Sequence, residues 1–229
     1  MKFNLLDHMR KLGLAGVGTT ILISAASSLA VADDTKNSIR IVAFGDSLTA
    51  GYLLRPNEAF PAQLQMALQA KGHKVEIVNA GVSGDTTAGG ADRLDWTLQN
   101  GADAVILELG ANDALRGLEP KQARANLNQM LTAITAKGTP VLLAGMRAPG
   151  NWGGDYVKTF DAIFPELAAK HGAALYPFFL DGVALNPQLV QADGLHPTAA
   201  GVAEIVKRIL PYAEALVARA AARATAAKN

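Results

Sequence analysis

The chain has 229 residues, of which 50% are hydrophobic and 18% charged, and its net charge is +1 with histidines counted neutral. These values are typical of one globular domain, and they exclude a disordered chain or a strongly basic one that would attract nucleic acid. The sequence contains no cysteine, which excludes a disulfide framework, a thiol nucleophile and a lipid-modified cysteine anchor.

The first 32 residues have the pattern of a secretory signal peptide. Three basic residues precede an uncharged stretch of apolar and small residues, and this stretch ends in the A-x-A cleavage pattern "AVA" at 30–32. A transmembrane anchor is the alternative, but glycine, serine and threonine dilute the stretch and no stop-transfer charges follow. We therefore expect cleavage of residues 1–32, export to the periplasm or the medium, and no stable membrane anchor. The mature chain, 33–229, is expected to form one domain with a net charge of about −1.

Five short apolar runs follow, and helical patterns separate them. Runs of this kind are typical of strands buried on both faces of a parallel sheet. The expected strands are 39–44, 74–80, 103–110, 140–146 and 173–179. The expected helices end near Gly72, Gly101, Gly138 and Gly172, and a last helix begins at Pro197, bends at Pro211 and frays in its alanine-rich tail. The alternation predicts a three-layer α/β/α domain with a five-stranded parallel sheet of the flavodoxin-like type.

Polar side chains come directly after several of these predicted strands. Ser47 follows the first strand, "SGDTT" (83–87) the second and "GAND" (110–113) the third, while "ADGLHP" (192–197) lies beyond the fifth. Ligands bind at the carboxyl ends of the strands in such sheets. We therefore expect these four segments to lie together at one edge of the sheet.

His196 is the best candidate for a general base. His8 lies in the predicted signal peptide, His73 in a charged turn and His171 at a helix C-terminus. A turn can bring the Asp193 carboxylate to Nδ1 of His196 and leave Nε2 free to face a serine. An isolated D-x-x-H also arises by chance, and Asp193 could simply cap the turn. No second histidine lies at ligand spacing, so we expect neither a metal site nor a cofactor.

The remaining polar loop residues are ambiguous when taken singly. Asn112 can donate its side-chain amide to an oxyanion or bond its own backbone, and Gly84 can supply an unobstructed N–H or simply permit a turn. Asp46 and Asp85 are expected to bond loop amides. The motifs G-x-S-x-G, G-x-G-x-x-G and G-x-x-x-x-G-K-[ST] are absent in the relevant contexts. This excludes the usual α/β-hydrolase elbow, a dinucleotide site and a P-loop.

Four blocks in register, "FGDSLTAGY", "NAGVSGDTT", "ELGANDALRG" and "DGLHP", resemble those of the GDSL, or SGNH, hydrolases over about residues 39–212. Within this superfamily the chain is most similar to exported bacterial esterases that act as thioesterases, lysophospholipases and arylesterases. The resemblance implies that Ser47 is the nucleophile, His196 its base and Asp193 the acid that orients the base. It also implies an oxyanion hole made by Ser47 N–H, Gly84 N–H and the Asn112 amide.

The expected activity is hydrolysis of esters and thioesters, with a small acyl substrate as the partner, no nucleic acid and a monomeric protein. A carbohydrate-ester deacetylase could use the same parts, and a flavodoxin-like binding module without catalysis is the third alternative. Two loops are expected to line an acyl-chain groove, through Leu115 and Leu118 on one and Trp152 and Tyr156 on the other. The alternative for Trp152 is that it only covers the sheet edge.

Overall fold

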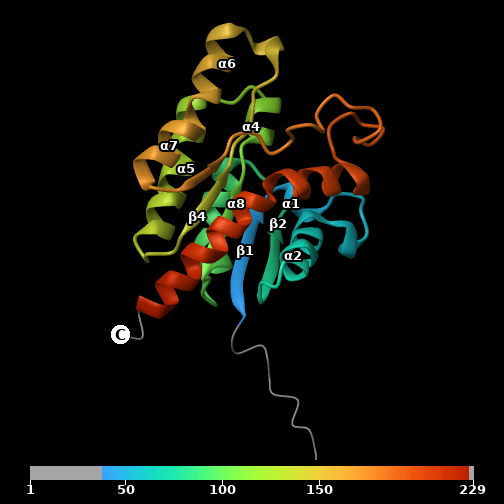
Figure 1. The fold of residues 1–229 in the computed structure, drawn as a ribbon. Helices are drawn as coiled ribbons and strands as arrows, with labels where there is room; N and C mark the ends of the chain where they lie inside the picture. Colours follow the sequence, from blue (N-terminus) through green and yellow to red (C-terminus); the bar gives the residue numbers. More distant parts are fainter. Residues whose placement is uncertain (1–37, 227–229) are drawn as a thin grey trace, which may run out of the picture. The chain divides into compact units, whose positions relative to one another are not determined.

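A five-stranded parallel sheet with strand order β2-β1-β3-β4-β5 forms the centre of the domain (Figure 1). The structure is a computed structural model that describes residues 38–226, all within one unit of the chain, Thr35–Asn229. The predicted signal peptide lies outside the described residues. The strands are β1 (Ile39–Gly45), β2 (Val75–Gly81), β3 (Ala104–Glu108), β4 (Val141–Ala144) and β5 (Ala174–Tyr176).

Helices cover both faces of this sheet, which confirms the predicted three-layer α/β/α fold. On one face α2 (Phe60–Ala70) packs against α8 (Ala199–Ala226). On the other face α5 lies between α3 and α7. The bounds of that layer are α3 (Thr87–Thr97), α5 (Pro120–Thr135), α6 (Gly154–Asp161) and α7 (Ile163–His171). The short elements are α1 (Ser47–Ala50), α4 (Ala111–Leu115) and two 3₁₀ turns, η2 (Pro56–Glu58) and η3 (Gly150–Trp152).

The structure differs from the sequence-based expectation at three places. Strand β5 stops at Tyr176, because Pro177 has no N–H to continue the ladder. The predicted helix that ends near Gly172 is two helices, α6 and α7, and α6 begins at Gly154, within the predicted loop that carries Trp152 and Tyr156. The expected fraying of the C-terminal tail is wrong for the described residues: α8 runs through Pro211 to Ala226, and Leu216, Val217 and Ala220 are buried against the domain. Residues 227–229 lie outside the described part of the chain.

The strand order places a topological switch point beside β1. The chain runs from β1 outward to β2 on one side and then crosses to β3 on the other. At such a point the loops at the carboxyl ends of the strands diverge and leave a crevice for a ligand. The segments after β1, β2 and β3 are those that carry Ser47, Gly84 and Asn112.

Candidate active site

Ser47 is the first residue of α1, directly beyond the carboxyl end of β1. The Asp46 carboxylate caps this short helix by accepting a hydrogen bond from the Leu48 N–H at 2.9 Å. Ser47 itself is only 8% exposed. Its N–H stands at the helix start, where backbone donors have no intrahelical acceptor. The turn therefore presents both the Ser47 hydroxyl and an unused backbone donor.

His196 connects Ser47 to Asp193. Its Nε2 lies 2.8 Å from Ser47 Oγ, and its Nδ1 lies 2.6 Å from Asp193 Oδ2. The other carboxylate oxygen of Asp193 accepts the N–H groups of His196 and Leu195 at 3.0 and 2.9 Å. These two backbone donors, with a smaller contribution from the His196 ring, lower the pKa of Asp193 to about 2. Asp193 is therefore ionised at neutral pH and holds a proton on Nδ1, so that Nε2 faces the serine as an acceptor.

The other two histidines in residues 38–226 lie elsewhere. His73 Nε2 is 3.3 Å from the carboxylate of Glu214 on α8, and His171 Nε2 is 3.0 Å from Asn128 Oδ1 on α5. Neither contacts the serine, so His196 is the base that this fold brings to Ser47.

Gly84 follows β2 with a φ of +86°, a left-handed conformation that favours glycine. Its carbonyl accepts a hydrogen bond from Arg116 Nη2 at 3.0 Å. Among residues 38–226 no group accepts the Gly84 N–H. That donor is thus available to a ligand, which is what an oxyanion site needs.

Asn112, on α4, is held by two acceptors. Its Nδ2 donates to the Asp85 carbonyl at 2.9 Å and to Asp46 Oδ2 at 3.2 Å, and its side chain lines the cleft beside Ser47. An oxyanion in the cleft would accept a hydrogen bond from the same Asn112 amide, in competition with the longer bond to Asp46. Asp46 thus links the serine turn to Asn112, beyond its expected bond to a loop amide.

Glu108 is a buried carboxyl group beneath the serine turn that the sequence analysis missed. It ends β3 and is 0% exposed. Its Oε2 accepts the Thr49 hydroxyl at 2.7 Å and the Asp46 N–H at 3.3 Å, while Oε1 has no partner among the described residues. Burial, and then the nearby Asp46 carboxylate, raise the pKa of Glu108 well above its usual value. Burial also raises the pKa of Asp46 to about 6, against its bonds from Leu48 and Asn112. Burial therefore favours the protonated form of Glu108 more strongly than that of Asp46.

Arg93 on α3 ties the ends of β1 and β2 together. Its guanidinium pairs with Asp85 at 2.6 Å and donates to the carbonyls of Ala80 and Gly45 at 3.0 and 2.9 Å. It also lies 3.9 Å from the centre of the Phe44 ring. Asp85 was expected to bond loop amides, whereas its carboxylate binds this arginine. The contacts of Arg93 could not be predicted from amphipathic periodicity, because Arg93 occupies an ordinary polar position of α3.

A cleft of about 470 Å³ opens beside Ser47 and His196. Most of its lining is apolar, and it comes from α4, from the segment after β4 and from the long connection between β5 and α8. Its larger apolar side chains include Leu115, Met146, Phe178, Leu180, Leu185 and Leu195. Leu115 was predicted from sequence as a residue of the groove. The residues after β5 that line the cleft were not predicted, because they show no hydrophobic periodicity.

Leu118, Trp152 and Tyr156, which were expected to line the groove, are not among the residues that line this cleft. The Trp152 Nε1–H donates to the Ala114 carbonyl at 2.8 Å, and the Tyr156 hydroxyl donates to the Leu118 carbonyl at 2.8 Å. Both aromatic side chains therefore fasten the segment around α4 to the η3–α6 segment. This placement favours the structural alternative for Trp152.

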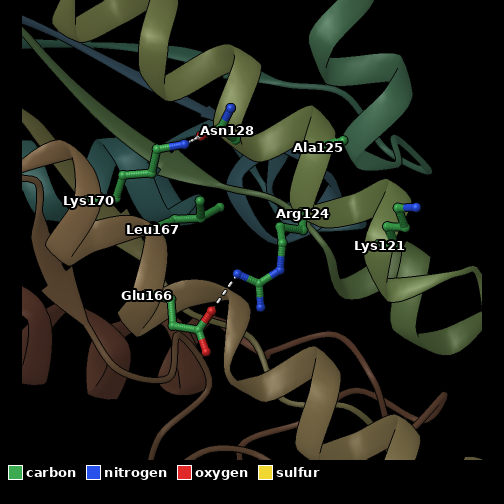
Figure 2. Close-up of a pocket in the computed structure, with 7 residues that line it drawn as sticks. All are labelled: Lys121, Arg124, Ala125, Asn128, Glu166, Leu167 and Lys170. Atoms are coloured by element: carbon green, nitrogen blue, oxygen red, sulfur yellow. Dashed lines mark hydrogen bonds and ion pairs between the residues drawn. The ribbon is translucent and has the colours of Figure 1, made fainter.

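A second cavity, of about 510 Å³, lies between α5 and α7 (Figure 2). Arg124 extends from α5 toward Glu166 on α7, and the two side chains pair at 2.6 Å. Lys170 bonds Asn128 across the same gap at 2.7 Å. These four polar side chains are therefore paired with one another across the cavity, and no triad residue lines it.

Two features are absent from residues 38–226. No cluster of three or more histidine, aspartate or glutamate side chains is arranged to hold a metal ion. None of the helices in this part of the chain combines the length and the apolar character that crossing a membrane requires.

Comparison with known proteins agrees with this geometry. The profile of the GDSL-like Lipase/Acylhydrolase family matches residues 43–203. Esterase TesA of Pseudomonas aeruginosa is 36% identical over 86% of this chain and 98% of its own length. The Vibrio mimicus arylesterase is 38% identical over 77% and 88% of the two chains. The Escherichia coli thioesterase 1/protease 1/lysophospholipase L1 is 42% identical over 69% and 74%.

Solved structures show the same likeness. A crystal structure of TesA superposes with a TM-score of 0.74 at 38% identity, over 77% of this chain and 99% of that one. The SGNH-hydrolase family esterase AlinE4 superposes with a TM-score of 0.67 at 48% identity, over 77% and 95%. The chain therefore belongs to the GDSL-like lipase/acylhydrolase family, and it is an SGNH hydrolase that acts on esters.

Proposed function

We propose that the protein hydrolyses carboxylic esters and thioesters with apolar acyl groups through an acyl-enzyme on Ser47. The observation that carries this proposal is the hydrogen-bonded chain Asp193–His196–Ser47, whose serine opens on an apolar cleft of about 470 Å³. Arylesters, acyl-thioesters and lysophospholipids share such an acyl group. The names of the relatives, an arylesterase and a thioesterase/lysophospholipase, point to the same range of substrates.

In the proposed mechanism His196 Nε2 accepts the hydroxyl proton as Ser47 Oγ attacks the carbonyl carbon. The N–H groups of Ser47 and Gly84 and the Asn112 amide bind the oxyanion of the tetrahedral intermediate, and each such donor is worth about 3 kcal/mol. His196 then gives its proton to the departing alkoxide or thiolate. Water attacks the acyl-enzyme by the same route, with His196 as the base, and releases the carboxylic acid and the free serine.

The decisive experiment is labelling with a fluorophosphonate probe. Wild-type protein is expected to be labelled, and Ser47→Ala is expected to lose both labelling and turnover while its circular dichroism spectrum is unchanged. Ser83→Ala is the matched control, because Ser83 is an exposed serine in the loop after β2 with no base beside it. Labelling that persists in Ser47→Ala would show that another residue is the nucleophile.

A panel of esters with acyl chains from C2 to C16 then addresses the substrate. The apolar cleft favours longer acyl groups over acetate, because each buried CH₂ contributes roughly 0.8 kcal/mol. A preference for acetylated sugars over all longer esters would support the deacetylase alternative. If the protein is not labelled and hydrolyses no ester, the alternative of a binding module without catalysis would be supported.

We also propose that the protein is exported, with residues 1–32 removed, and that it acts as a monomer. The support for export is the uncharged apolar stretch and the "AVA" pattern at 30–32. Intact-mass measurement of the protein from the periplasmic fraction should give a chain that begins at Asp33. Sedimentation should give the mass of a single chain.

A further inference from the structure

Exposed apolar side chains gather around the active-site cleft. Of the eleven large hydrophobic residues that are exposed in residues 38–226, seven lie in the loops and short elements beyond β1, β2, β3 and β5. The seventh is Leu118, whose carbonyl binds the Tyr156 hydroxyl, and we call the other six the apolar rim: Tyr52, Leu53, Val82, Leu115, Leu185 and Leu195. The remaining four lie on other elements: Met66 on α2, Trp96 on α3, Trp152 on η3 and Tyr212 on α8. Single exposed apolar residues are ordinary, whereas a group at one edge indicates a contact surface.

Two leucines of the rim have a backbone conformation that folding does not explain. Leu53 has a φ of +57° and Leu185 a φ of +64°, and they are the only non-glycine residues with positive φ between residues 38 and 226. Left-handed backbone is strained for a leucine and is normally occupied by glycine or asparagine. These side chains are also 77% and 94% exposed. Each leucine therefore adds strain without burying apolar surface, so its use must lie outside the folded core.

The rim is continuous with the catalytic groups. The Tyr52 ring lies 4.5 Å from the His196 ring, centre to centre. Gln191 Nε2 donates to the Tyr52 carbonyl at 2.9 Å, which ties the loop of Leu53 to the loop of His196. Leu185 and two other rim residues line the cleft itself. A surface that meets the rim therefore lies directly over the entrance to Ser47.

We propose that the apolar rim docks the protein on aggregated lipid, a micelle or a bilayer surface, so that acyl chains enter the cleft from that surface. This deepens the proposed function, on which it rests, by naming the physical form of the substrate. Exposed leucines and an aromatic side chain that penetrate the boundary between headgroups and acyl chains are typical of interfacial binding.

The charges on the same face favour lipid over a second copy of the chain. Arg116 and Arg147 are exposed beside the cleft, and neither pairs with a carboxylate among residues 38–226. Guanidinium groups complement the phosphates of lipid headgroups. A symmetric contact through this face would instead bury the same unpaired positive charges from both copies.

The test measures binding of the Ser47→Ala protein to sedimented vesicles of phosphatidylcholine with phosphatidylglycerol, so that turnover plays no part. Adding Leu53→Asn should lower the partition coefficient about tenfold, because one leucine loses its apolar contact. The melting temperature should stay equal or rise, since asparagine tolerates left-handed backbone. Trp96→Gln, at a 72% exposed position on α3, is the matched control and should bind like the parent.

Several results would overturn the proposal. The first is that the parent Ser47→Ala protein does not bind vesicles. The second is that adding Leu53→Asn leaves the partition coefficient unchanged, and the third is that Trp96→Gln lowers it as much as Leu53→Asn does. Self-association without lipid that Leu53→Asn abolishes would instead assign the rim to a second copy of the chain. Because Ser47→Ala cannot turn over, vesicle binding without any esterase activity in the wild type would refute the proposed function and leave the docking surface intact.

Discussion

Replacing Glu108 by glutamine should change how stability depends on pH. Glu108 is fully buried, and burial raises the pKa of its carboxyl well above its usual value of about 4.3. Because the folded-state pKa is raised, folding is favoured when this group is protonated in both states, below about pH 4.5. The advantage is lost as pH rises, since the unfolded chain releases a proton that the folded protein keeps. Glutamine has no proton to release.

The size of this effect follows from the linkage relation. For every pH unit over which the unfolded chain has released this proton and the folded protein keeps it, the wild type loses about 1.36 kcal/mol relative to the variant. The difference in unfolding free energy should therefore move in favour of Glu108→Gln as the pH rises from 4 to 7. Any local cost of the amide applies at both pH values and cancels. The amide oxygen can still accept from Thr49, which now bonds Glu108 at 2.7 Å.

Urea unfolding followed by circular dichroism at pH 4, 5, 6 and 7 measures this shift. Glu76→Gln is the control, because Glu76 is an exposed carboxylate on β2, a strand of the same sheet. The control should show no comparable shift. A stability difference that is the same at pH 4 and pH 7, or that turns against Glu108→Gln as pH rises, would mean that Glu108 is ionised in the folded protein. The inference that burial favours the protonated form of Glu108 would then be wrong.

Three further substitutions test the site. Asn112→Ala should lower kcat by about 10²–10³ with little change in KM, because one oxyanion donor is lost; an unchanged kcat would remove Asn112 from the oxyanion site. Asp193→Asn should lower kcat by about 10⁴, because an amide no longer holds the proton on Nδ1 of His196, and a loss under tenfold would contradict that role. Trp152→Phe should lower stability by about 1 kcal/mol through loss of the bond to the Ala114 carbonyl. It should leave the acyl-chain profile unchanged, and an altered profile would return Trp152 to the substrate groove.

The layers of the fold and the edge that bears the site could be predicted from sequence, because both depend on local patterns. Apolar runs that alternate with amphipathic segments predicted β1 to β5 and the surrounding helices. The boundaries of the elements were less predictable. No local sequence pattern indicated that α8 continues to Ala226, because this depends on the packing of Leu216 and Val217 against the rest of the domain. The D-x-x-H pattern made Asp193 and His196 a plausible pair because they lie within one turn.

Other features depend on contacts between distant segments, and no local pattern could have revealed them. Ser47 and His196 are 149 residues apart, and only the folded domain brings Ser47 Oγ and His196 Nε2 to 2.8 Å. Glu108 reads as one polar letter in a buried strand, yet the pairing of β3 with β1 puts its carboxyl beneath the serine turn. Residue chemistry and strand position are local properties, so they show which residues could perform acyl transfer. Folding decided which of these residues meet and which carboxyl is buried deeply enough for its pKa to rise well above its usual value. It also decided that Leu53 and Leu185 face outward on strained backbone, because distance, burial and φ arise only when the chain is folded.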